Sequence, residues 1–574
     1  MNKKRQRVYV AAAAAMAILT ATAEDLRTEV VVERTVEPQE RAATRLSGVV
    51  PDMVTRSVTP TQLSYAEYSY ASELTALIAR LDPARYSSIP ARSPYRGYAA
   101  IGYFPLLNIG ATAGYRIIDN DKTMLGLHAQ YSGSQYDGYA DAVGTKPKVK
   151  NHSVGVTADF SHHFSAVSAL GIGADFGYTA LGNPLYGADY KQNVTRFDAT
   201  AAWTSQVGRV GYGVNAGVGV MGFSKDMPLA AYGAGVSAPG VSETRISGGA
   251  GVAYLSAKGQ PIAGLKLSAD FVSSDDALPT YYGEASAAAV QRPTLGVISL
   301  TPYYKLKYQR FTASLGAKID ISTGGEGKKF HVAPDVVLGL DAASQCGVYV
   351  RLGGGEHLNT LRSLYDYTPY MPSAWVYGRS HVPVTIDAGI NIGRFGGFGV
   401  ELKGGYAVAN DWLMPIMAFG EDVTPMFASV NLKGFHYGAR LSYEHKRYFE
   451  AYASVEGAPQ KYDRGYYLWR DRAKIVVSGG VTVHPIERLD TKVDYNYRGS
   501  RRIYSATPGE MSAGTPKTEE LGSVSELSLG ATYKINEKVT VYARGENILG
   551  HRYDIYPGLP SAGVHGLAGV SLKF

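Results

Sequence analysis

The sequence predicts an all-β fold, a transmembrane antiparallel up-and-down β-barrel of about 22 strands over residues 97–574. Three observations predict it. Apolar and polar residues alternate along nearly every segment of this region, short and long connections alternate between the segments, and the chain ends on an aromatic residue. Successive side chains of a strand point to opposite faces, so alternation gives one apolar and one polar face. A barrel with lipid outside and a polar lumen inside needs this pattern in every strand.

The N-terminus has the three parts of a secretory signal peptide. A basic stretch over 3–7 precedes an apolar run over 8–21, and Ala21-Thr22-Ala23 supplies a cleavage site. A membrane anchor is the alternative, but the run is shorter than the ~20 residues that a spanning helix needs. We therefore expect residues 1–23 to be cleaved after export, so that the mature chain begins at Glu24.

Residues 24–96 are expected to form a periplasmic segment ahead of the barrel. Apolar residues at helical spacing, among them Tyr70, Leu74 and Leu77, predict one amphipathic helix near 61–81, which Asp82-Pro83 would end. Three placements suit such a helix. It would lie on the periplasmic rim of the barrel, insert into the lumen, or bind a partner protein.

The region 97–574 divides into segments with the length and alternation of strands. These segments are 97–105, 108–118, 123–134, 149–163, 165–178, 192–206, 209–223, 241–257, 261–275, 294–307, 309–321, 330–341, 345–353, 381–393, 396–408, 426–445, 449–460, 472–484, 487–498, 521–534, 537–546 and 562–574. From the third segment on, short connections alternate with long ones such as 354–380 and 409–425. Outer-membrane barrels have short periplasmic turns and long outer loops, so an even number of strands would leave both termini in the periplasm.

One hairpin, over 472–498, shows the alternation most clearly. Its first strand sets Ile475, Val477 and Val481 against polar neighbours, and Pro485-Ile486-Glu487 is expected to turn the chain. One face of the return strand carries five charges: Arg488, Asp490, Lys492, Asp494 and Arg498. Burying unpaired charge in a soluble core costs several kcal/mol or more per ion, so this face is expected to line a polar lumen. We interpret the five residues as a self-paired network that stiffens the wall or holds a plug; a substrate site is the alternative.

The last strand ends the chain with an apolar face. Val570, Leu572 and Phe574 share that face, whereas Ser571 and Lys573 lie on the other. A terminal Phe on such a strand resembles the C-terminal signature by which outer-membrane barrels are recognised for insertion. This resemblance implies that the barrel-insertion machinery binds the strand during biogenesis and that outer-membrane lipid surrounds the finished barrel.

Composition excludes several classes of protein. Beyond the signal peptide no apolar run approaches the ~18 residues of a helical membrane span, and the mean hydropathy is −0.12. The single cysteine, Cys346, allows no intramolecular disulfide. The formal net charge of +7 comes from residues spread along the chain rather than clustered, so nucleic acid is not an expected partner.

The sequence contains no recognisable enzyme constellation, and no cofactor is expected. Gly324-Gly325-Glu326-Gly327-Lys328 lacks the first glycine of a phosphate-binding loop. His162-His163 falls at a predicted turn, and adjacent strand residues point to opposite faces, which makes a poor metal pair. A Ser–His site assembled from distant strands, as in barrel lipases, stays open as an alternative. It would predict hydrolysis of phospholipids or esters.

The C-terminal region resembles a known family. The run Val539–Tyr553 precedes Tyr556-Pro557-Gly558 and a last strand ending in Phe574. This order resembles the end of the barrel in TonB-dependent receptors, and Gly353–Tyr365 resembles loops of such barrels. Gly550 stands where the family has a second Asn, and the Tyr-Pro loop is permuted. The resemblance covers residues 97–574 only.

The resemblance implies a function as well as a fold. It implies an outer-membrane protein of a Gram-negative bacterium, of the Bacteroidota type, that binds or transports a solute. In this family the energising protein TonB grips a short N-terminal box. The candidate box is Glu29, Val30, Val31, Val32 and Glu33, and an ordinary extended segment is the alternative interpretation.

The family's plug domain has no counterpart in the pattern of residues 24–96, which are too few for it. A barrel of about 22 strands is wide enough to need a plug. The N-terminal segment, folded-in loops, or a periplasmic or lipoprotein partner would have to fill the lumen. A second hypothesis follows: a plugless, non-transporting barrel subunit of an outer-membrane assembly or secretion complex.

Overall fold

The computed structural model describes most of the chain from residue 95 onward. The described residues are 95–104, 108–140, 144, 146–182, 190–228, 237–238, 240–257, 259–274, 278–279, 289–290, 294–325, 327–367, 369, 378–419, 423–446, 448–462, 473–505, 517–556 and 559–574. The expected signal peptide, the helix near 61–81 and the candidate box from Glu29 to Glu33 lie outside them.

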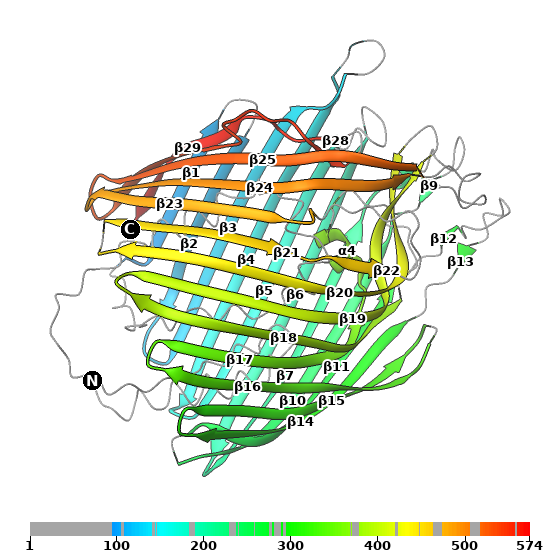
Figure 1. The fold of residues 1–574 in the computed structure, drawn as a ribbon, viewed down its shortest axis with the longest axis vertical. Coiled ribbons are helices and arrows are strands. Elements are labelled where there is room, and N and C mark those ends of the chain that lie inside the picture. Colours follow the sequence, from blue (N-terminus) through cyan, green and yellow to red (C-terminus); the bar gives the residue numbers. More distant parts are fainter. Residues whose placement is uncertain are drawn as a thin grey trace.

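A single antiparallel sheet closes into a barrel (Figure 1). Its wall has 22 strands, as the sequence predicts, with β22 (Gln460–Tyr462) continuing the short β21 along β20. The wall strands are β1 (Gly97–Phe104), β2 (Asn108–Asp119), β3 (Thr123–Asp137), β4 (Lys148–Ser165), β5 (Ser168–Gly182), β6 (Lys191–Val207), β7 (Val210–Phe223), β10 (Ser242–Leu255), β11 (Pro261–Ser274), β14 (Leu295–Tyr308), β15 (Phe311–Thr323), β16 (Phe330–Ala343), β17 (Cys346–Leu358), β18 (Arg379–Phe395), β19 (Phe398–Phe419), β20 (Val423–His445), β21 (Phe449–Gly457), β23 (Val476–Ile486), β24 (Leu489–Ser505), β25 (Lys517–Lys534), β26 (Val539–Glu546) and β29 (His565–Lys573).

Each wall strand pairs with the next one along the chain, and β1 pairs with β29 to close the circle. The described parts of the connections hold three small two-stranded ribbons: β8 (Met227–Pro228) with β9 (Ser237–Ala238), β12 (Leu278–Pro279) with β13 (Ala289–Val290), and β27 (Asp554–Tyr556) with β28 (Leu559–Pro560). Among the described residues, no helix is long and apolar enough to cross a membrane.

The two faces of the wall differ as the alternation predicts. Asp198 forms an ion pair with a residue of the helix inside the barrel, whereas its neighbour Phe197 points outward and is 42% exposed. The same outward face carries many exposed apolar side chains: Ile101, Val154, Val156, Ile172, Phe176, Val214, Val218, Ile246, Leu267, Val332, Ile386, Leu402, Val493 and Leu529. Such a surface suits lipid rather than water.

The connections differ from the prediction in several places, of which three concern residues singled out in the sequence. His162 and His163 lie within β4, because the turn is at 166–167. The turn of the 472–498 hairpin is Glu487-Arg488 rather than Pro485-Ile486-Glu487. The expected long loop over 409–425 is wrong, because β19 and β20 stay paired as far as Phe419 and Val423.

A bulge explains the error in the third connection. The β19–β20 register shifts between Ala409 and Trp412, and Asp411 has a φ of 53°. An extra residue on one strand moves the following side chains to the opposite face. The alternation therefore breaks after Val408 although the strand continues.

Candidate functional site

The described part of the connection between β17 and β18 folds into the barrel lumen. It contains α4 (Leu361–Tyr367), the only helix among the described residues, which lies within the wall of strands in Figure 1. Thr360 and Ser363 cap its first turn, each donating its backbone N–H to the other's hydroxyl at 2.9 Å. Leu361 and Leu364 are both 3% exposed. Local capping and apolar burial thus form a short helix over Leu361–Tyr367.

The helix is held by strands that lie well away from its own stem along the wall. Arg362 forms an ion pair with Asp198 of β6, and Asp366 lies 3.6 Å from Arg196 of the same strand. Glu243 of β10, itself 3% exposed, accepts a hydrogen bond from the backbone N–H of Leu361 at 2.5 Å. A carboxylate at a helix N-terminus is favourable because it meets unpaired N–H groups and the positive end of the helix dipole. Wall residues therefore bind both the side chains and the backbone of α4.

An aromatic contact completes this attachment. Tyr365 meets Phe223 of β7 edge to face, with ring centroids 5.9 Å apart, and the Arg196 guanidinium lies 5.7 Å from the Tyr365 ring.

Burial raises the pKa of Asp366 above its usual value, although Arg196 and Arg362 oppose the shift. We call α4 with its wall partners Arg196, Asp198, Phe223 and Glu243 the helix latch. The latch places a folded segment inside the barrel. Folded-in loops are one of the three ways in which we expected the lumen to be filled.

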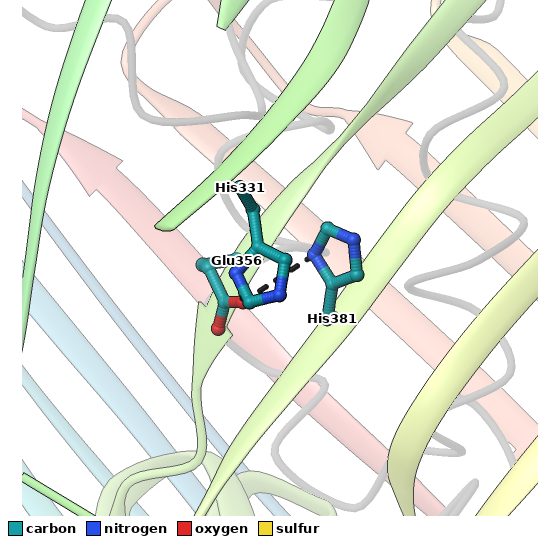
Figure 2. Close-up of side chains that lie close together, drawn as sticks. All are labelled: His331, Glu356 and His381. Atoms are coloured by element: carbon teal, nitrogen blue, oxygen red, sulfur yellow. Dashed lines mark ion pairs between the residues drawn. The ribbon is translucent and has the colours of Figure 1, made fainter. Parts of the chain in front are cut away.

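Three potential metal ligands meet at the stem of the same connection. His331 lies near the start of β16, Glu356 near the end of β17, and His381 near the start of β18 (Figure 2). His331 Nδ1 is 2.5 Å and His381 Nδ1 is 3.3 Å from the same oxygen, Glu356 Oε1. The two imidazole rings stack with centroids 3.8 Å apart. We call these three residues the His–Glu–His cluster.

A glycine bulge turns Glu356 toward the lumen. The β17–β18 register shifts between Gly353 and Gly355, after which Glu356 pairs with His381. Gly355 has a φ of +128°, which favours glycine, and a Cβ there would lie 2.6 Å from Lys318 Nζ. The extra residue changes which side chains face inward. The triple glycine at 353–355 therefore brings the carboxylate and the imidazole to the same face.

A second group of polar residues positions Glu356. Asp320 of β15, which is fully buried, accepts a hydrogen bond from the Glu356 backbone N–H at 2.8 Å and another from the Ser299 hydroxyl at 2.5 Å. Lys318 Nζ is 3.8 Å from Asp320. Arg379 lies 3.8 Å from Oε2, the second oxygen of Glu356. Glu356 thus directs one carboxylate oxygen to the two histidines and the other to a guanidinium.

Four of the five charges predicted to form a network lie along β24, but most of their partners are elsewhere. Lys492 and Asp494 pair with each other at 2.9 Å. Asp490 is 2.6 Å from His484 and 3.9 Å from Lys534, and Arg498 is 3.7 Å from Glu526. Arg488 lies in the turn before the strand. The structure therefore spreads these charges over pairs with β23 and β25 residues and does not join the five to one another.

The C-terminal residues lie at the seam of the barrel. Val570 stands opposite Ile101 on β1 and Val541 on β26, and Leu572 stands opposite Ala99 and Val539. Phe574 follows the last strand, is 59% exposed, and stacks on Tyr115 with centroids 6.3 Å apart. These three residues thus join the first strand to the last.

Neither the helix latch nor the His–Glu–His cluster is evident from the sequence. The cluster joins residues from three strands, each far from the next in sequence, so no local motif marks it. Two local signals were present: the Gly353-Gly354-Gly355 run, which precedes Glu356, and the Thr360/Ser363 pair, which caps α4. Both lie in the segment Gly353–Tyr365 that resembles receptor loops.

Comparisons with known proteins concern the fold. No family model matches the sequence, and no curated protein matches it. Among solved structures, the FrpB iron transporter of Neisseria meningitidis (F5-1 variant, apoprotein) is 12% identical, with a TM-score of 0.64 over 84% of this chain and 82% of that one. The copper transporter OprC is 12% identical, with a TM-score of 0.60 over 84% and 80%. The siderophore receptor PirA of Acinetobacter baumannii is 9% identical, with a TM-score of 0.61 over 84% and 81%.

These likenesses bear directly on the resemblance found in the sequence. Identities of 9–12% carry no information on substrate, whereas coverage of 84% of the chain includes most of the barrel. The C-terminal motifs, which resemble the end of TonB-dependent receptor barrels, predicted a large closed β-barrel, and the structural neighbours confirm that fold.

Proposed function

We propose that this protein is an outer-membrane barrel that takes up a solute into the periplasm of a Gram-negative bacterium. The observation that supports this most is a closed 22-strand wall whose lumen holds the helix latch. A wide barrel needs an internal obstruction to preserve the permeability barrier, and an obstruction held by ion pairs is able to move. Its long connections would face the outside. The start of the first wall strand and the end of the last one would both face the periplasm.

Metal-bearing solutes are the first class to test. The solved structures with similar barrels are named as iron and copper transporters and siderophore receptors. Nothing in the identities ties their substrates to this chain, so the substrate class rests on fold likeness alone. We propose iron and copper complexes as the starting panel.

Energy for uptake would come from TonB acting on the candidate box. The stretch Glu29, Val30, Val31, Val32 and Glu33 is rich in β-branched residues. Such a segment suits recognition by strand addition, in which backbone hydrogen bonds give much of the affinity. The residues after the box, 34–96, would then connect it to the barrel.

The test compares cellular uptake in matched strains. Strains with the wild-type gene, a deletion, Val31→Pro or Val31→Ala would be grown in iron- or copper-limited medium, and cell-associated metal would be measured by mass spectrometry. Proline removes a backbone donor and opposes strand pairing, whereas alanine keeps the donor. Uptake should fall to the deletion level with Val31→Pro and stay near wild type with Val31→Ala. Equal uptake of every metal complex in the wild-type and deletion strains would contradict the proposed solute class.

A further inference from the structure

We propose that the His–Glu–His cluster binds a divalent transition-metal ion, of which Zn²⁺ is the best match, and that this ion fixes the stem of the lumen connection. The stem comprises Glu356–Asn359 and Gly378–His381. This site is separate from the transported solute, and it does not depend on the proposed uptake function.

The donor atoms have the right chemistry. Two imidazole nitrogens and one carboxylate oxygen, all within 4.8 Å of one another, form a set that suits Zn²⁺, with Co²⁺, Ni²⁺ and Cu²⁺ as competitors. Calcium and magnesium prefer oxygen ligands only, so they are poor candidates. Three protein ligands leave a fourth position for water.

The distances are close to those of a metal site. Ligand atoms of a tetrahedral Zn²⁺ with bonds of ~2.0–2.1 Å lie roughly 3.3 Å apart. The separation between His381 Nδ1 and Glu356 Oε1 is 3.3 Å, and that between His331 Nδ1 and the same oxygen is 2.5 Å. Binding would require the His331 ring to move back by less than 1 Å, a shift on the order of that distance mismatch. It would also turn the rings out of their stacked arrangement.

Burial and hydrogen bonding leave these nitrogens available to an ion. The side chain of Glu356 is 2% exposed, and those of His331 and His381 are 14% and 15% exposed. The Nδ1 atoms of both histidines are shielded from solvent, and within the described residues each lies against the same carboxylate oxygen, Glu356 Oε1. Two buried imidazole nitrogens that share one carboxylate oxygen are a donor set that a cation would satisfy.

The surroundings resemble the outer support of a metal site. Asp320 holds the backbone of Glu356, and Arg379 faces the second carboxylate oxygen. Glu356 would therefore act as a ligand through Oε1 alone. Partners of this kind orient metal ligands and strengthen binding.

An ion here would act on the connection that carries α4. Glu356 and His381 belong to the two sides of the stem, and His331 belongs to the adjacent strand β16. The stem is already joined by Asn359, whose backbone N–H donates to the Gly378 carbonyl at 3.2 Å and whose amide donates to the Ser380 hydroxyl at 2.9 Å. A metal bridge would tie the stem to the wall and restrain the helix latch.

The test measures Zn²⁺ on the purified full-length barrel, prepared with a tag that contains no histidine. After dialysis against a weak chelator, bound zinc would be counted by mass spectrometry, and affinity would be measured by calorimetry. The variants are His331→Ala, His381→Ala and Glu356→Gln. The matched control is His484→Ala, which removes another lumen histidine beside a carboxylate, Asp490, at 2.6 Å. Migration as a folded barrel in semi-native gels would confirm that each variant is folded.

We expect one zinc per wild-type barrel, an affinity lower by at least ~10-fold in each cluster variant, and no change in the control. Tryptic cleavage after Arg362 should speed up when zinc is removed with EDTA from wild type, but not from the cluster variants. Equal zinc binding by wild type and the His331→Ala/His381→Ala double variant would overturn the site. Zinc binding with unchanged cleavage would overturn its role in fixing the stem. Neither result bears on uptake, which the strain comparison tests separately.

Discussion

Gly97 and Phe574 exchange backbone hydrogen bonds across the seam of the barrel: Gly97 N–H donates to the Phe574 carbonyl at 2.7 Å, and Phe574 N–H donates to the Gly97 carbonyl at 2.9 Å. These bonds extend the pairing of β1 with β29 to the end of the chain. A closed barrel has no free strand edge, so backbone groups that lipid cannot satisfy are paired with one another. The terminal aromatic residue is thus part of the closure.

Replacing Phe574 should weaken the seam. Phe574→Ala removes the stacking on Tyr115, a contact of ~1 kcal/mol or more, together with ring contacts over Gly97. The folded fraction of the protein in the outer membrane, measured by its mobility in semi-native gels, should fall severalfold. Phe164→Ala is the matched control, because Phe164 is 58% exposed at the end of β4 and lies far from the seam. Equal losses in the two variants would show that the terminal position has no special role.

Breaking the helix latch should open the lumen. Asp198→Asn leaves Arg362 without its ion-pair partner on β6, and losing such a half-buried pair costs on the order of 1–3 kcal/mol. The conductance of the purified protein in planar bilayers should rise. Exchanging the charges, with Asp198→Arg and Arg362→Asp together, should restore the low value. Lys403→Gln, which alters a separate pair with Glu456, serves as the control. Unchanged conductance in Asp198→Asn would contradict an obstruction held by this pair.

Asp366 should make the latch sensitive to acid. Burial in the docked helix raises the pKa of its carboxyl above the value of 3.8, so the docked state binds a proton more tightly than the undocked one. Docking is therefore strengthened as pH falls through the raised pKa and weakened as pH rises through it. Asp366→Asn should remove this dependence and leave conductance at neutral pH no higher than in wild type.

The comparison with Asp366→Asn isolates one group among several. Arg196, Asp198 and Glu243 of the wall face the docked helix, Arg362 lies on the helix beside Asp366, and all four are present in both proteins. Conductance measured from neutral to mildly acidic pH in wild type and variant would therefore differ only through Asp366. Identical pH profiles for the two proteins would show that its titration does not affect docking.

Gly355 should be intolerant of a side chain. Alanine at a φ of +128° is strained by roughly 1–3 kcal/mol, and its Cβ would meet Lys318 Nζ at 2.6 Å and Asp320 Oδ2 at 3.0 Å. The melting temperature, above which the protein no longer migrates as a folded barrel in semi-native gels, should be lower for Gly355→Ala than for wild type. Gly347→Ala on the same strand is the matched control, because a Cβ there meets nothing within 4 Å. Equal melting temperatures for Gly355→Ala and wild type would mean that the bulge is not required.

Strand alternation made the wall predictable, because each strand must repeat it to face lipid on one side. Residues such as Phe197 and Asp198 show the rule in adjacent positions, and the expected 22 segments correspond to the observed strands. The rule failed where bulges interrupt it, at Gly355 and near Asp411. The latch and the His–Glu–His cluster were beyond prediction because they depend on which strands lie side by side and on a loop that folds inward. The pairing of β16 with β17 and the glycine bulge bring His331 to Glu356, and only the inward fold of the connection brings Arg362 to Asp198.

The measurement that tests the proposed uptake function most directly is a mild-detergent pull-down of the tagged protein from native outer membranes, followed by mass spectrometry. An uptake barrel should be recovered without a stoichiometric partner, because its own connection occupies the lumen, and TonB should be captured only after cross-linking. A periplasmic protein or lipoprotein recovered in a one-to-one ratio would contradict that function. The chain would then be a non-transporting subunit of a larger outer-membrane complex.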